Sequence, residues 1–209
     1  MINLLTDKLP KSVEIDGETH RIRWEYQFVI KIDCALRDPG MPEDMRLMTA
    51  LGLFYRDGIP SNVREAIEQL RRFMAHDKPQ NRAQQQAEKR YQDAPAVFSY
   101  EHDDEYIFAA FMQLYGINLA REQDMHWYEF RALLSGLDEC PFTRIKGWRG
   151  TDLSKIEDAK TRARYGELKE LWALPISAHE QREMDEIEQI LRDGGDLSAY
   201  MAGRESDNV

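Results

Sequence analysis

Apolar side chains recur at two different spacings along the chain, and the change of spacing predicts where strands give way to helices. Near the N-terminus, Val13 and Ile15 alternate with polar residues, and Asp16-Gly17 follows as a turn signal. This pattern predicts a β-hairpin from about Val13 to Arg23. From Trp24 onward the apolar residues recur with a helical period. We therefore expect the chain to be mainly helical beyond the hairpin.

Three amphipathic helices are predicted in the N-terminal part of the chain. The first begins at Trp24 and stops before Asp38-Pro39-Gly40, a sequence that ends helices. The second carries an apolar stripe before Gly58, and the third begins after Ser61-Asn62. The short turn between them predicts a helical hairpin. The second stripe consists of Met45, Met48, Leu51, Phe54 and Tyr55.

The C-terminal part of the chain predicts further helices of the same kind. The four acidic residues within 101–105 favour a helix start, and Gly116 is expected to close that helix. We predict that Asp124 caps the next helix and that Gly136 ends it. A short segment around residues 145–148 and a loop through Gly150 are expected to follow. A long helix is then predicted from about Ser154 to Leu174, before Pro175.

The pattern as a whole predicts a mainly α fold, a multi-helix bundle with a short N-terminal β-hairpin. We expect four parts: a hairpin and helices at 1–76, a linker or exposed helix at 77–95, a helical part of the same fold at 96–176, and an acidic helix with a mobile tail at 177–209. The last helix is marked by a capping box at residues 177–180. From Glu180 to Val209 there are nine acidic and three basic side chains, so this part carries over half of the net charge.

Composition narrows the class of protein. The net charge of -10 and the mean hydropathy of -0.65 are typical of a soluble protein and disfavour nucleic-acid binding, which needs clustered cations. Basic residues between 141 and 172 are interleaved with acids, as on a solvated helix face. No apolar run is long enough for a membrane span, and the first residues do not form a signal peptide. Cys34 and Cys140 have no paired motif, so we expect reduced thiols and a cytoplasmic location.

Candidate chemistry is sparse. His126 and Glu129 have the spacing of two metal ligands on one helix face, but no second pair joins them. Residues 102–105 lack the ligand alternation of a calcium loop, and a helix start explains them better. No nucleophile motif, phosphate loop or dinucleotide fingerprint is present. We therefore predict no catalytic residues, no metal site and no cofactor.

Five segments, in order, resemble the bacteriophage "gene product fifteen" family of tail-region proteins. They are NLLTDKLPKSVEIDG (3–17), IFAAFMQLYGINL (107–119), HWYEFRALLSGL (126–137), WRGTDLSKI (148–156) and ELKELWALP (167–175). The ordered recurrence is more specific than any one segment. The stretch after Ala178 departs from the shorter members of the family, so the resemblance does not cover its role.

The resemblance implies a function for which the residues alone give no argument. Family members lack an established biochemical activity, but their genes tend to lie just ahead of the tape-measure gene, as tail assembly chaperones do. This implies a non-catalytic assembly factor in the host cytoplasm that holds the tape-measure protein and also binds other tail proteins. A structural component of the finished tail is the alternative, and an uncharacterised hydrolase is a remote one. The oligomeric state stays open.

A chaperone of this kind needs an apolar surface that a partner helix can reach. Met45, Met48 and Leu51 are candidates for one wall of such a groove, because flexible side chains repack on different partners. Trp127 and Tyr128 are further candidates for partner binding. Aromatic residues at helical spacing usually face the core, so core packing is the favoured interpretation for any one of these residues.

Overall fold

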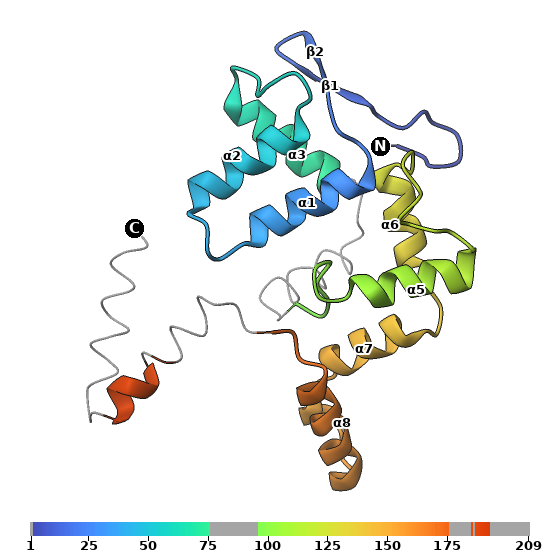
Figure 1. The fold of residues 1–209 in the computed structure, drawn as a ribbon, viewed down its shortest axis with the longest axis vertical. Coiled ribbons are helices and arrows are strands. Elements are labelled where there is room, and N and C mark those ends of the chain that lie inside the picture. The colour runs from blue at the N-terminus through green and yellow to red at the C-terminus, as the bar shows by residue number, and fades with distance from the viewer. Residues whose placement is uncertain (1, 76–95, 176–184, 186, 193–209) are drawn as a thin grey trace. The chain divides into compact units, whose positions relative to one another are not determined.

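The computed structural model describes residues 2–75, 96–175, 185 and 187–192. The chain divides into two compact units, one of Met1–Arg37 with Glu43–Leu174 and one of Asp38–Pro42 with Pro175–Val209. The described part of the first unit is mainly helical with an N-terminal two-stranded hairpin, as predicted (Figure 1). The predicted linker at 77–95 and the capping box at 177–180 lie outside the described residues. In the second unit, residues 187–192 are helical, within the last helix expected from the sequence.

The N-terminal hairpin is confirmed. Strand β1 (Ser12–Ile15) pairs antiparallel with β2 (Glu18–Arg21), with Ile15 opposite Glu18. Asp16 and Gly17 both have positive φ, 52° and 81°, which is the backbone that a tight two-residue hairpin turn requires. Asparagine, aspartate and glycine adopt this conformation most readily, so the local sequence fixes the turn.

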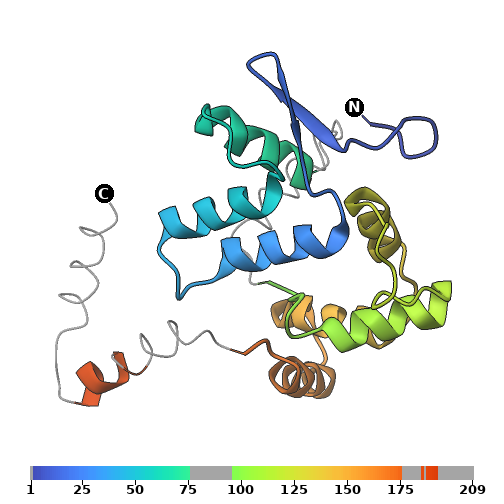
Figure 2. The same ribbon diagram turned by 45° about the horizontal axis from the view of Figure 1, so that its top comes forward.

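The three N-terminal helices are also confirmed. They are α1 (Tyr26–Arg37), α2 (Glu43–Phe54) and α3 (Val63–Ala75). Helix α1 packs along α2, and the two lie side by side in both Figure 1 and Figure 2. Helix α3 packs against α2 and against β1. The side chains that these helices bury include Val29, Ile32, Ala50, Leu51, Phe54, Ala66, Leu70 and Phe73.

The described C-terminal part of the first unit begins with α5 (Asp104–Tyr115), α6 (Trp127–Ser135) and α7 (Pro141–Gly150). Gly116 closes α5 in the left-handed conformation, as predicted. Helix α7 replaces the short segment and loop that we expected up to Gly150. Pro141 stands in its first turn, where the missing N–H costs nothing, and the Thr143 hydroxyl accepts the Cys140 N–H at 2.9 Å.

The cap of α6 is His126, and the prediction of Asp124 was wrong. The Nδ1 atom of His126 accepts the Tyr128 N–H at 3.1 Å, and the Glu129 carboxylate accepts the His126 N–H at 2.8 Å. These two bonds form a reciprocal capping box, a motif in which serine or threonine usually holds the cap position. The pair that had the spacing of metal ligands therefore starts a helix.

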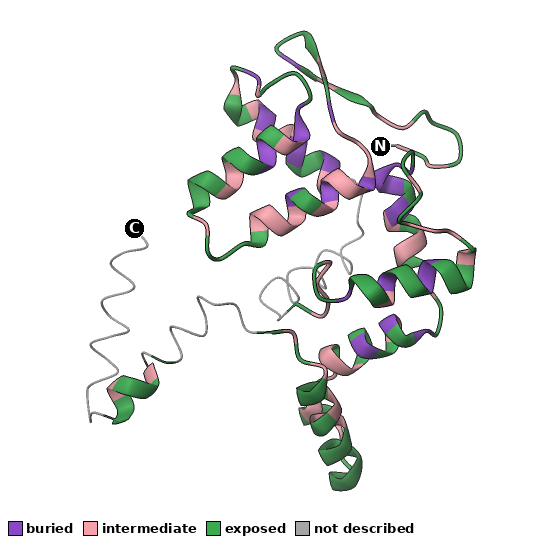
Figure 3. Ribbon diagram, viewed as in Figure 1, coloured by how far each residue is buried: buried purple, intermediate pink, exposed green. Residues whose placement is uncertain are grey.

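The long helix predicted from Ser154 to Leu174 is interrupted. A 3-10 turn, η1 (Leu153–Lys155), precedes α8 (Ala159–Leu171). Asp152 caps the turn, and the Asp158 carboxylate accepts the Thr161 N–H at 2.6 Å to start α8. Two caps therefore divide one apparent helical run. Helix α8 has no buried residue, as Figure 3 shows by its lack of purple.

Stacked aromatic rings join the N-terminal and C-terminal helices of the first unit. Phe130 of α6 stacks on Tyr26 of α1, with ring centroids 4.6 Å apart, and on Phe111 of α5 at 5.2 Å. Trp127 stacks on Phe130 from the same helix. All four side chains are buried. The interpretation of Trp127 as a core residue is confirmed.

A buried ion pair ties α5 to α7. The Arg149 guanidinium donates to both carboxylate oxygens of Asp103 at 2.6 and 3.0 Å, and the Asp103 side chain is 1% exposed. Arg149 also donates to the carbonyl oxygens of Val97 and Trp172. Such a paired group fixes geometry, because losing either partner leaves a buried charge without compensation.

His126 is a second buried polar group whose partners are complete. Its Nε2 lies 3.0 Å from the carbonyl oxygen of Pro10, and because Nδ1 accepts from the helix, Nε2 carries the proton that it donates. The ring stacks on Trp24 with centroids 5.5 Å apart. Burial lowers the pKa of His126, against smaller raising effects of the Pro10 bond and Glu129. The folded protein therefore holds this ring neutral.

We expect Trp127→Ala to reduce the free energy of unfolding by about 3 to 5 kcal/mol, because it removes a buried indole and leaves a cavity. The indole Nε1 also donates to the Met74 carbonyl oxygen at 3.3 Å. Urea unfolding followed by circular dichroism measures the loss. Leu171→Ala on the exposed face of α8 is the control, with an expected change of about 0.5 kcal/mol or less. Equal losses in both variants would contradict the core position of Trp127.

We expect acid to weaken the fold through His126. Its pKa is lowered in the folded state, so the unfolded chain takes up a proton first, and stability falls as pH drops below about 6.5. His126→Asn keeps a capping oxygen but cannot titrate. The wild-type protein should therefore lose free energy of unfolding relative to this variant as the pH falls from about 7.5 to about 5. The loss is at most about 1.4 kcal/mol for each unit by which the pKa of His126 differs between the folded and unfolded chain. Urea unfolding across this range measures it, and a difference that does not change with pH would contradict the buried neutral ring.

Candidate partner-binding site

The structure separates the five residues that the sequence offered for partner binding. Met45 and Met48 lie on the outer face of α2, where their exposed fractions are 57% and 50%. Leu51 faces the core from the same helix and is fully buried. Trp127 and Tyr128 are also buried. In this conformation a partner reaches only the two methionines, and the binding role of all five residues stays a prediction.

A second apolar surface, which the sequence did not indicate, lies between α1 and α5. It is a hollow of about 400 Å³ that is open to solvent, and we name it the α1–α5 groove. Its lining comes from segments far apart in the chain, which is why no local motif marks it. The lining residues are Tyr26, Ile30, Tyr100, Asp104, Glu105, Ile107, Phe108, Leu119, Ala120 and Phe130.

Hydrogen bonds fix the wall that the loop after α5 contributes. The Tyr26 hydroxyl donates to the Leu119 carbonyl oxygen at 2.7 Å, and the Gln27 side chain donates to the carbonyl oxygen of Glu122. Burial, with a smaller effect of Glu122, raises the pKa of Tyr26 and keeps its hydroxyl a donor. Tyr26 also stacks on Phe130, so the floor of the groove belongs to the aromatic core.

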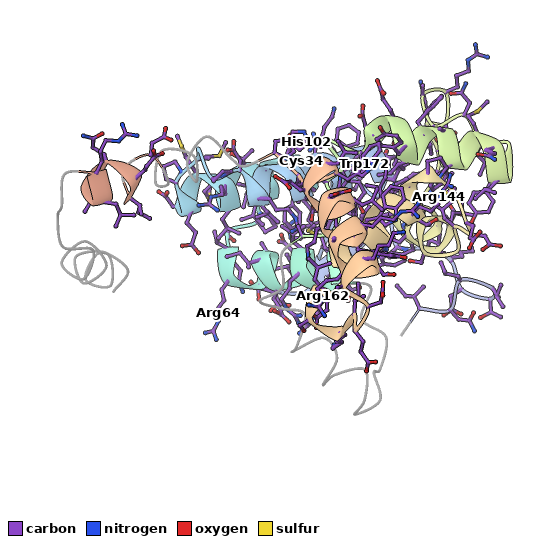
Figure 4. The ribbon with its side chains drawn as sticks, turned by 90° about the horizontal axis from the view of Figure 1, so that it is seen from below. Cys34, Arg64, His102, Arg144, Arg162 and Trp172 are labelled. Carbon is purple, nitrogen blue, oxygen red and sulfur yellow. The ribbon has the colours of Figure 1, made fainter. Side chains whose placement is uncertain are left out.

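Carboxylates gather around the groove. Asp104 and Glu105 line it from the first turn of α5, and both are exposed. Burial, with smaller effects of the Glu101 and Asp33 charges and against an opposing effect of Arg37, raises the pKa of Cys34, one helical turn beyond Ile30 on α1, to about 11. Figure 4 labels Cys34 and His102, the neighbour of Glu101, in the same part of the molecule. Within the described part of the chain, neither Asp104 nor Glu105 forms a salt bridge.

The apolar surface of the groove continues onto the outer face of α5. Phe108 lines the groove and is 36% exposed, and Met112 is 42% exposed one turn further along. With Glu105 these residues have i, i+3, i+7 spacing and share one helix face. Leu114 is similarly exposed, at 38%, but its position in the helical repeat places it on the opposite side from Glu105. The stripe therefore runs out of the groove along one face.

A different hollow, of about 460 Å³, lies over α3 and is polar. It is lined by Asn62, Arg64, Glu65, Ile67, Glu68 and Arg72. Glu68 forms ion pairs with Arg71 and Arg72 at 3.0 Å, and the arginine contacts lower its pKa to about 2. This face is an ion-paired helix surface of the kind that a soluble protein shows to water.

The described residues offer little reactive chemistry. They contain no group of three or more histidine, cysteine or acidic side chains that is placed to hold a metal ion. Cys34 and Cys140 are free, and Cys140 is buried. Among the described helices none has both the length and the apolar character needed to cross a bilayer.

Comparison with known proteins gives one match. The model of the family described as Bacteriophage Gp15 protein matches residues 5–174. No curated protein and no solved structure matches the chain. The matched stretch includes every element from β1 to α8, and with them the α1–α5 groove and both methionines of α2. Since this match covers most of the chain, the protein belongs to the bacteriophage Gp15 protein family.

Proposed function

We propose that this protein is a non-catalytic tail assembly factor that holds the phage tape-measure protein in the host cytoplasm and leaves before the particle is complete. The family match over residues 5–174 carries the proposal, because the family resemblance implies a gene position ahead of the tape-measure gene. The matched region also presents apolar side chains at its surface. Other tail proteins are further partners under the same proposal.

The outer face of α2 supports a holding role. Met45 and Met48 are one helical turn apart and at least half exposed, although unbranched apolar side chains gain free energy by burial. Methionine adapts its shape to different partner surfaces, which suits a protein that holds a long repetitive chain. Leu51, Trp127 and Tyr128 are buried, so in this conformation they are not available for direct contact with a partner.

A structural component of the finished tail is the alternative function. It rests on the same family and the same exposed surfaces, so the composition of the mature particle separates the two. No observation favours a hydrolase. Permanent incorporation would bury the exposed methionines in a lasting interface, whereas a holding protein exposes them again on release.

Co-expression with the tape-measure protein tests the holding role. We expect the pair to co-purify, and we expect Met45→Asp with Met48→Asp to reduce the recovered partner about tenfold or more, because charges are then forced into an apolar contact. Leu171→Asp, an equally drastic change at an exposed leucine of α8, is the matched control and should leave recovery unchanged.

Mass spectrometry of purified particles provides the second measurement. We expect the protein to be absent from mature tails while the tape-measure protein is present. Stoichiometric incorporation would favour the structural alternative. Failure of the wild-type protein to co-purify with the tape-measure protein would remove the holding role.

A further inference from the structure

The α1–α5 groove has the form of a site for an elongated apolar partner. Its hollow is at the small end of the range of about 300 to 1,000 Å³ that ligand sites occupy, and it is open to solvent. The apolar surface does not end at its mouth but continues from Phe108 to Met112 along α5. A compact small molecule would leave this stripe uncovered. A helix laid along α5 covers the stripe and places one side chain in the hollow.

The rigidity of the groove favours a specific side chain at its centre. The floor is formed by Tyr26 and Phe130, which are stacked in the core, and the loop wall is held by the bond from Tyr26 to Leu119. A site that is already formed requires little ordering when a partner binds, so less of the interaction free energy is lost. A large apolar side chain of a partner therefore binds more favourably on this rigid floor than on a flexible surface.

The charge around the groove selects the sign of the partner. Asp104 and Glu105 line it without a salt bridge in the described part of the chain. Glu101 lies near Cys34 on α1, where the nearby cation Arg37 is paired with Asp33 at 2.9 Å. The positive end of the α5 dipole amounts to about half a charge, so it does not cancel two carboxylates. A second copy of this chain has a net charge of -10, so long-range repulsion disfavours it as the partner. A partner with lysine or arginine beside its apolar stripe is complementary.

We infer that the α1–α5 groove binds an amphipathic helix of a tail protein, with one large apolar side chain in the hollow and basic side chains against Asp104 and Glu105. The identity of that tail protein as the tape-measure protein rests on the proposed function, whereas the chemistry of the groove is independent of it. The groove supplies a defined anchor and a direction, because the carboxylates lie at only the N-terminal end of α5.

Two synthetic peptides test the chemistry with the full-length protein. The first is an amphipathic helix of about 18 residues, long enough for five turns, with a leucine stripe, one central tryptophan and flanking lysines. The second replaces each lysine with glutamate. Fluorescence anisotropy should show binding of the lysine peptide and at least about tenfold weaker binding of the glutamate peptide. No binding of the lysine peptide, or equal binding of both peptides, would overturn the inference.

Variants on α5 test the position of the site. Phe108→Asp should weaken binding of the lysine peptide about tenfold or more, because Phe108 lines the groove. Leu114→Asp is the matched control, since Leu114 is exposed to nearly the same extent on another face of α5, and should change the affinity less than about twofold. Equal losses in the two variants would overturn the position.

A second pair of variants covers the case in which Phe108→Asp does not fold. Ala120 is exposed at the edge of the groove, so Ala120→Arg introduces a long cationic side chain there without changing a core residue. This variant should also block binding of the lysine peptide. Ala109→Arg is its control, because Ala109 is an exposed alanine of α5 outside the groove lining. Unfolding curves confirm that each variant folds. Binding by a folded Ala120→Arg protein at wild-type affinity would count against the site.

The acidic end of the groove has a matched control in α2. The double variant Asp104→Asn with Glu105→Gln should bind the lysine peptide about threefold more weakly, and its binding should depend less on salt. Glu43→Gln with Asp44→Asn removes two first-turn acids of α2 and should have no effect. An equal effect of both double variants would assign the charge preference to the whole molecule and overturn the specific contact.

The tape-measure protein then separates this inference from the proposed function. If it co-purifies with the wild-type protein but not with Phe108→Asp or Ala120→Arg, both stand. If it co-purifies equally with all variants, the groove assignment is wrong and the holding role stands. If it never co-purifies while the lysine peptide still binds at the groove, the holding role is wrong and the chemistry of the groove stands.

Discussion

The fold of the first unit depends on the packing of Phe130 among the other large rings of the core. This side chain of α6 stacks on Tyr26 from α1 and on Phe111 from α5, so it joins segments that the sequence separates widely. Stacked rings of this size remove much apolar area from water and favour few relative orientations. Tyr26 and Phe130 also form the floor of the α1–α5 groove. The interaction that closes the core therefore shapes the candidate site.

Two buried polar contacts set the directions of the helices around that core. His126 starts α6 through its capping box, while its other ring nitrogen donates to Pro10 before the hairpin. Arg149 of α7 donates two hydrogen bonds to the carboxylate of Asp103, the residue immediately before α5, so α7 fixes where α5 begins. Asp104 and Glu105 follow directly, and the ion pair thereby determines the position of the acidic end of the groove. Segments that carried the family resemblance, HWYEF and WRG, supply these contacts.

The sequence predicted what short-range periodicity and turn chemistry determine. The Asp16-Gly17 turn and the helices α1 to α3 follow from such local patterns. The His126 cap was missed because histidine rarely holds that position, and two aspartate caps divided the run that ended at Leu174. The groove was beyond local reasoning, since the bond from Tyr26 to Leu119 spans 93 residues. Exposed Met45 and buried Leu51 share one predicted stripe, and only packing separates them.

Acidity and exposed apolar side chains are complementary in a protein that holds another chain. An exposed apolar stripe promotes self-association, and the net charge of -10 opposes it because two copies of the chain repel each other. A partner with basic residues beside its apolar stripe is attracted by the negative charge, so the same charge that keeps copies apart favours that partner.

The two apolar surfaces differ in kind. The methionines of α2 are exposed and unbranched, which suits contact with many sequences, whereas the groove has an aromatic floor packed in the core, which suits one large side chain. Under the two proposals above, a single acidic protein would combine an adaptable contact with a selective one.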